Sequence, residues 1–110
     1  MHITVEQLQA YLHQHYSPWA NEQGLFMKLV EEMGEVAEIL NKRSGRKASE
    51  EDDLSQALTE ELADMLHYIV AIAAVNGLNL EDMILEKDQK ASVKYHREVN
   101  LQQFLEQKHT

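Results

Sequence analysis

Helical periodicity is the feature that most restricts how this chain folds. Apolar residues recur at intervals of three and four along almost all of its 110 residues, which is the spacing of one face of an α-helix. Only one proline and four glycines interrupt the pattern. The sequence therefore predicts an all-α fold, an antiparallel bundle of four to five helices in a single domain spanning residues 1–110. Because so short a chain buries only a modest core, we expect homo-oligomerisation to complete the bundle, as a homodimer or a homotetramer.

Capping residues divide the pattern into segments. The helices that they predict cover about residues 4–15, 18–43, 50–76 and 80–95. The residues that define these ends are Thr4 with Gln7, Ser17 before Pro18, Ser49, Gly77 as a C′ residue, and Asn79. The polar tail over residues 96–110 has only a few apolar positions, and it is either helical, exchanged with a partner chain or frayed.

Composition excludes several classes of function. The net charge of −9 repels polyanions, so we expect no binding to nucleic acid through its phosphate backbone. The chain has no cysteine, which rules out disulfides and thiolate chemistry. The N-terminus does not read as a secretory signal, and the longest apolar run is too short to span a bilayer. We therefore expect a cytoplasmic protein without a membrane partner.

A repeated acidic spacing is the main functional signal. Glu32 and Glu35 lie three residues apart in LVEEMGEVAEIL, and Glu61 and Asp64 lie three apart in LTEELADMLHYI. Both pairs are embedded in apolar helical patterns, where a carboxylate is costly unless its charge is compensated. Four carboxylates on two neighbouring helices suit a hard divalent cation, magnesium or alternatively manganese.

Helical projection gives both pairs the same position beside their core stripes. One carboxylate lies about 60° from the centre of the stripe and the other about 120° from it. In an antiparallel hairpin the two pairs also reach a similar level. The projected stripe of the second helix contains Leu25, Phe26, Leu29, Met33, Val36 and Leu40. That of the third contains Leu54, Leu58, Leu62, Met65, Ile69, Ile72 and Ala73. Acidic residues at the border of an apolar stripe are usually just solvent-exposed residues without a function. For these two matched pairs, that explanation and a cation site are evenly balanced.

Other side chains are candidates for contacts with a phosphorylated ligand, each with an ordinary alternative. Lys28 either offsets the carboxylates and meets a phosphate, or forms a salt bridge to Glu32. Tyr68 and Trp19 either line a nucleotide pocket or belong to the core. A basic stripe on the fourth helix either clamps a polyphosphate or is a solvated face; it contains Lys87, Lys90, Lys94 and Arg97. The histidines form no ligand set, and the projection places His67 opposite the stripe of the third helix.

These motifs resemble a known family. The segments KLVEEMGEVAE over residues 28–38 and EELADML over residues 60–66 are similar to the EExxE and ExxD signature of MazG-like nucleoside triphosphate pyrophosphohydrolases. The resemblance covers about residues 19–95. Their superfamily is all-α and also includes dimeric dUTPases and phosphoribosyl-ATP pyrophosphohydrolases.

The resemblance implies magnesium-dependent cleavage of a nucleoside triphosphate between its α and β phosphates, which gives the monophosphate and pyrophosphate. It makes Glu32, Glu35, Glu61 and Asp64 the metal ligands. Glu35 is our choice as general base, with Glu38 as the alternative. The resemblance also implies that Lys87, Lys94 and Tyr68 contact the substrate. Ala91 and Lys94 stand where many relatives have Asn and Arg, so Lys90 is a candidate substitute.

Two rival functions stay open at this point. One is a non-catalytic helical dimerisation or regulatory module, in which the acidic pairs are ordinary boundary residues. The other is a relative with the same metal site but a dedicated substrate, either dUTP or phosphoribosyl-ATP.

Overall fold

The computed structural model describes residues 1–16, 21–45 and 51–108, and all regular structure within these ranges is helical. This confirms the predicted all-α class. The helices are α1 (Val5–Tyr16), α2 (Glu22–Ser44), α3 (Glu51–Val75), α4 (Leu80–Lys94) and α5 (Leu101–Lys108).

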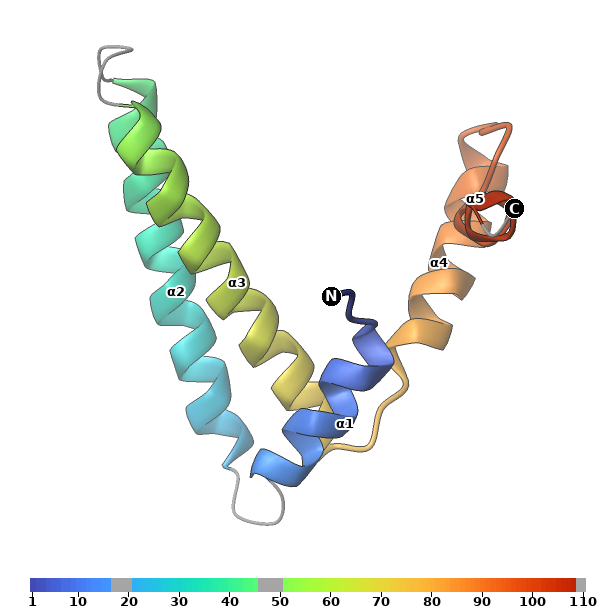
Figure 1. Cartoon of the computed structure of the whole chain (residues 1–110), viewed down its shortest axis with the longest axis horizontal. Coiled ribbons are helices and arrows are strands. Elements are labelled where there is room, and N and C mark those ends of the chain that lie inside the picture. Colours follow the sequence, from blue (N-terminus) through green and yellow to red (C-terminus); the bar gives the residue numbers. More distant parts are fainter. Residues whose placement is uncertain (17–20, 46–50, 109–110) are drawn as a thin grey trace.

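The helices are arranged as an open V (Figure 1). One arm is the long antiparallel hairpin of α2 and α3, and α1 packs across the C-terminal half of α3 at the base. The other arm is α4 with α5, which leaves the base and diverges from the hairpin. α4 contacts α1 at its start, where the backbone N–H of Glu6 donates a 2.8 Å hydrogen bond to the Glu81 carboxylate.

The core lies at the base of the V, where three helices meet. Leu12 of α1 is fully buried, and it clusters with Leu25 of α2 and with Val70, Ala71 and Ala74 of α3. The small alanine side chains let α1 approach the α3 backbone closely, so this half of α3 has two helical neighbours. Among the residues that the structure describes, the arms above the base have no comparable core.

Most of the predicted helix ends are confirmed by their caps. Thr4 and Gln7 exchange reciprocal 3.0 Å hydrogen bonds as a capping box at the start of α1. Gly77 follows α3 with φ of +64°, and the N–H of Leu78 reaches back to the carbonyl of Ala73. Asn79 caps α4 by accepting a hydrogen bond from the N–H of Asp82 at 3.0 Å.

The predicted start of the second helix was wrong. α2 begins at Glu22, with Asn21 as its N-cap at φ −98°, and the Asn21 side chain accepts hydrogen bonds from Gln23 and Gly24. An asparagine carbonyl satisfies two first-turn N–H groups here, so the helix begins later in the chain than the Ser-Pro signal predicted. Ser17, Pro18 and Ser49 lie outside the described residues.

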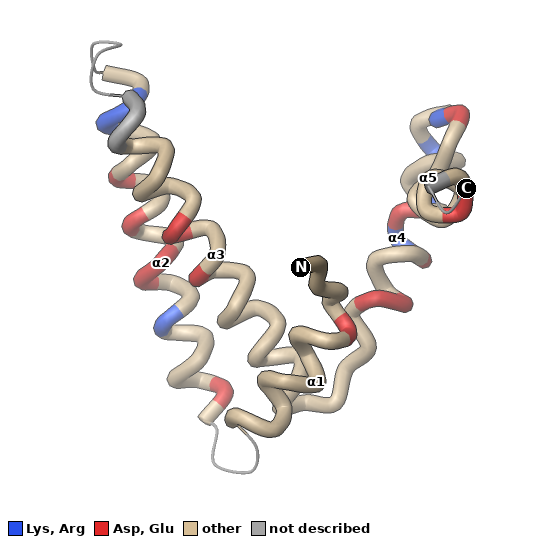
Figure 2. The backbone as a smooth tube through the Cα atoms, viewed as in Figure 1, with Lys and Arg blue, Asp and Glu red and all other residues tan. Residues whose placement is uncertain are grey.

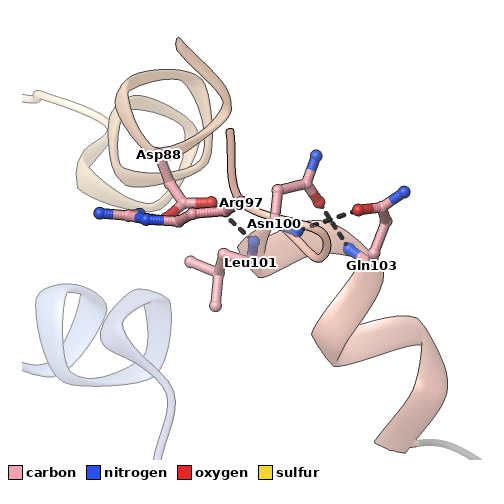
Figure 3. A network of polar contacts seen from close by, with 5 residues as sticks. All are labelled: Asp88, Arg97, Asn100, Leu101 and Gln103. Carbon is pink, nitrogen blue, oxygen red and sulfur yellow. Dashed lines mark hydrogen bonds and ion pairs between the residues drawn. The ribbon is translucent and has the colours of Figure 1, made fainter. Parts of the chain in front are cut away.

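Of the three alternatives for the C-terminal tail, the helical one is confirmed over residues 101–108. A tight corner fixes α5 on α4 (Figure 3). The Asp88 carboxylate pairs with Arg97 at 3.4 Å and accepts the N–H of Leu101 at 2.6 Å. Asn100 and Gln103 form a second reciprocal capping box, with both bonds at 2.9 Å.

The predicted core stripes of the hairpin were rotated from their true position. The half-buried seam of α2 contains Leu25, Leu29, Glu32, Val36 and Ile39, whereas Phe26, Met33 and Leu40 are exposed. On α3 the seam contains Leu54, Leu58, Glu61, Met65, Tyr68 and Ile72, whereas Leu62 and Ile69 are exposed. Glu32 and Glu61 therefore lie inside the seam between the helices, not at its edge.

The two broad faces of the hairpin differ in character. We count rotation about each helix axis from its seam glutamate, Glu32 on α2 and Glu61 on α3. Met33 and Leu62 are rotated by about 100° in one direction. Glu35 and Asp64 are rotated by about 60° in the other direction. Two antiparallel helices related by a perpendicular two-fold axis keep equal rotations on the same face. One face is therefore acidic and also carries α1, and the opposite face is apolar and exposed.

None of the described helices is by itself long and apolar enough to cross a membrane, although residues 54–75 and 80–94, bent by 109°, satisfy length and composition criteria as a pair.

Candidate metal centre

Acidic residues of α2 and α3 lie at the same level, about halfway along the hairpin (Figure 2). One oxygen from each of Glu32, Glu61 and Asp64 lies within 4.8 Å of the other two. Glu35 lies one helical turn from Glu32, and its carboxylate contributes to the raised pKa of Glu61. The structure thus brings together the four acidic residues of the two motifs.

Two oxygens of this cluster are in an unfavourable environment. Oε2 of Glu32 and Oε2 of Glu61 are shielded from solvent and have no hydrogen-bond donor in the part of the chain that the structure describes. A shielded carboxylate oxygen without a donor is costly, and two in contact repel each other as well. The seam of the hairpin is therefore unfavourable for folding at this level unless a proton or a cation occupies it.

The raised pKa of Glu61 reflects the same repulsion between carboxylates. A hydrogen bond to Glu32, a second to Glu35 and then burial raise the pKa of Glu61 from 4.5 to about 8. Two ionised carboxylates cannot form a hydrogen bond, since both only accept, so one of them must hold a proton. In the metal-free chain, a proton held within the cluster is therefore favoured over full ionisation of its carboxylates.

The donor set fits a hard divalent cation. Magnesium and manganese take carboxylate oxygens, and a cation between Glu32, Glu61 and Asp64 would satisfy the shielded oxygens and replace the shared proton. Asp64 and Glu35 are exposed, so the cluster is open on its acidic face to a ligand that arrives with the metal.

Neighbouring charged residues are paired away from this cluster. Lys28 forms an ion pair with Glu31 at 3.6 Å, so its predicted alternative bridge to Glu32 is absent. Glu38, the alternative general base, pairs with Lys42 at 3.0 Å.

The lysines of α4 are not brought to the carboxylates within one chain. Lys87, Lys90 and Lys94 line a hollow of about 280 Å³ with Ala91 and Tyr95. Lys90 pairs with Glu86 at 3.3 Å. This hollow belongs to the other arm of the V, and Figure 1 shows how far α4 diverges from α2.

The structure places the aromatic and histidine side chains differently from the helical projection. Tyr68 is half-buried and packs against the core cluster, which favours its structural reading, and Trp19 lies outside the described residues. His67 is not on a free face of α3, because it packs under α1, where its Nε2 lies 2.7 Å from the hydroxyl of Tyr16. The projection missed this contact because it considered only the α2 side of α3.

Comparison with protein-family models identifies a MazG nucleotide pyrophosphohydrolase domain over residues 20–97. This match covers most of the chain. The protein belongs to the MazG nucleotide pyrophosphohydrolase family. Comparisons with curated proteins and with solved structures gave no match.

The MazG region contains the whole carboxylate cluster and the lysine hollow of α4, and it leaves α1 and α5 outside. Membership identifies the general chemistry as hydrolysis of a nucleotide phosphoanhydride. The acidic cluster agrees with the metal dependence that is typical of the family.

Proposed function

We propose that this MazG protein is a magnesium-dependent pyrophosphohydrolase that cleaves a nucleoside or deoxynucleoside triphosphate between the α and β phosphates, in the cytoplasm. The observation that carries the proposal is the convergence of Glu32, Glu61 and Asp64 within 4.8 Å, with two shielded oxygens that need a cation. A dimerisation module has no use for repelling carboxylates in its helix seam.

The chain's own residues have distinct roles in this proposal. Glu32, Glu61 and Asp64 hold the metal, and Glu35 completes the set from the exposed rim. Magnesium bound there supplies charge screening for the phosphate oxygens and activation of the attacking water. Glu35 takes the proton of that water as general base, since it is exposed beside the cluster, whereas Glu38 is engaged with Lys42.

A second copy of the chain completes the molecule in this proposal. The apolar face of the hairpin exposes nearly half of the side chains of Met33, Leu40, Leu62 and Leu66. Pairing two such faces removes them from water and gives a four-helix bundle. In such a pair, the lysines of α4 are candidates for contacts with a triphosphate held by either chain.

The decisive assay measures pyrophosphate release from all eight common ribo- and deoxyribonucleoside triphosphates, with and without magnesium. We expect release only with magnesium, and a loss of at least about 100-fold in Glu32→Gln and Asp64→Asn, because each removes a charged ligand. Glu60→Gln is the matched control, since Glu60 is exposed and lies next to Glu61 without joining the cluster. Full activity in Asp64→Asn, or equal losses in Glu60→Gln, would refute the assignment.

The oligomeric state has its own test. Light scattering of the wild type is expected to give at least twice the mass of the 12.7 kDa chain. Leu62→Lys is expected to reduce that mass, and a monomeric wild type at assay concentration contradicts the pairing.

A further inference from the structure

Helix α5 leaves an apolar stripe in solvent. Leu101, Phe104 and Leu105 recur at helical spacing along one side of this helix, and polar residues fill the other side. Leu101 is half-buried beside α4, whereas Phe104 is 46 % exposed and Leu105 is 44 % exposed. A helix of only eight residues is too short to be stable in water by itself, so α5 needs packing along this stripe.

The corner between α4 and α5 gives the stripe a defined direction (Figure 3). The Asp88 carboxylate holds both Arg97 and the N–H of Leu101, and the capping box of Asn100 and Gln103 fixes the first turn of α5. α5 also follows the MazG region, which ends at residue 97. The stripe is therefore an ordered surface on a helix that this chain has beyond the family domain.

An apolar hollow of about 440 Å³ lies at the start of α2. Its wall contains Phe26 and Met27 of α2 and Ile72 of α3, and Glu22 and Gln23 form a polar rim. Both Phe26 and Met27 are more than half exposed. Because Phe26 precedes Met33 by seven residues, the hollow continues the exposed apolar face of the hairpin. Its volume is sufficient for two apolar side chains.

The stripe and the hollow are separated within one chain. α5 lies at the free end of one arm of the V, and the start of α2 lies at the base of the other arm (Figure 1). Both surfaces are exposed to solvent in the single chain. A contact between them therefore needs two copies.

The exposed area of the chain is consistent with extensive contact between copies. It exposes 8724 Å² with a radius of gyration of 17.2 Å, whereas a compact monomer of this mass has about 6,200 Å² and about 13 Å. The excess is about 2,500 Å² per chain, and two copies that bury it remove about 5,000 Å² from water, as permanent homodimers do. Pairing of the hairpin faces covers only α2 and α3, so it leaves the arm with α5 in solvent.

We propose that α5 of one copy packs Phe104 and Leu105 into the hollow at the start of α2 of a second copy, and that the exchange is reciprocal. The inference rests on the pairing of hairpin faces in the proposed function. Antiparallel pairing sets the base of one hairpin level with the arm ends of the other copy, where α5 lies (Figure 1). A two-fold axis then closes both contacts in one dimer.

Cross-linking tests the contact directly, because the chain has no cysteine of its own. Met27→Cys chains are mixed with Leu105→Cys chains under mild oxidation, and linked peptides are identified by mass spectrometry. A disulfide needs Cα atoms within about 7 Å, so we expect the 27–105 link at a yield at least about fivefold above the matched mixture of Met27→Cys with Glu106→Cys. Glu106 is exposed on the polar side of α5. A dimer that gives no 27–105 link above this control, or links only two Leu105→Cys chains, overturns the proposal.

Dissociation measures how much the contact contributes. Leu105→Glu places a charge in the apolar contact, so we expect the dimer Kd to rise at least about tenfold in a dilution series followed by light scattering. Met27→Glu changes the hollow and should have the same effect, which keeps the test valid if one variant does not fold. Glu106→Gln is the control and should keep the wild-type Kd. A wild-type Kd in both Leu105→Glu and Met27→Glu overturns the proposal.

Leu62→Lys separates this inference from the hairpin pairing. A dimer that Leu62→Lys dissociates and that Leu105→Glu leaves intact keeps the pairing and overturns the docking of α5. A monomeric wild type overturns both. A dimer that forms the 27–105 link and releases no pyrophosphate refutes the proposed activity and supports the docking of α5.

Discussion

The two halves of α3 bury opposite kinds of side chain. In its C-terminal half, Val70 is 1 % exposed and Ala71 is 0 % exposed, packed against Leu12 of α1. Halfway along, the same helix turns Glu61 into the seam with α2, where its Oε2 is shielded and has no donor among the described residues. The first region follows the rules of a stable core and the second breaks them. The contrast teaches that stability and chemistry are separated along one helix. Apolar packing at the base offsets the unfavourable free energy of shielding the carboxylates.

The largest expected effect tests the apolar region. Leu12→Ala leaves a cavity at the junction of α1 and α3, so we expect the free energy of unfolding to fall by about 2–5 kcal/mol, measured by urea denaturation. Ile3→Ala is the control, because Ile3 is exposed and its truncation should stay within about 0.5 kcal/mol. A loss as small as that of the control would contradict the assignment of Leu12 to the core.

The carboxylate region should respond in the opposite direction. Glu32→Leu removes a shielded oxygen without a donor, so we expect the metal-free protein to gain about 1–3 kcal/mol of unfolding free energy while pyrophosphate release is lost. Glu31→Leu, at the exposed neighbouring position, should change stability by no more than about 0.5 kcal/mol. Destabilisation by Glu32→Leu in the presence of EDTA would show that the seam is satisfied without a cation.

The smallest effect concerns pH. The pKa of Glu61 is raised from 4.5 to about 8 in the folded chain, so between these values the folded state binds more protons than the unfolded state. Stability of the metal-free protein should therefore fall as pH rises from about 4.5 to 8, and the contribution of Glu61 is lost above that range. The measurement is the melting temperature in EDTA against pH, for wild type and Glu61→Gln. The difference between the two curves isolates Glu61, and parallel curves would contradict the shift.

Local signals in the sequence predicted local structure well. The capping box at Thr4, the left-handed Gly77 and the cap at Asn79 each act within a few residues, so no tertiary information is needed to recognise them. The proximity of the acidic pairs was also predictable, because equal offsets on two antiparallel helices bring them level. Their role as metal ligands stays a prediction.

Rotation of the helices could not be predicted. α2 and α3 have apolar residues on two faces, and the sequence does not say which face meets the neighbouring helix of the same chain. The projection chose the face with Met33 and Leu62, whereas the hairpin buries the one with Glu32 and Glu61. For the same reason the contact of His67 with α1 was missed.

The most direct test of the metal centre is the change in melting temperature with magnesium, against a control of equal ionic strength, for wild type, Asp64→Asn and Glu60→Gln. A cation that binds only the folded state raises its stability in proportion to occupancy. The account predicts a clear rise in wild type and Glu60→Gln and none in Asp64→Asn. No rise in wild type beyond the salt control, or an equal rise in Asp64→Asn, would contradict it.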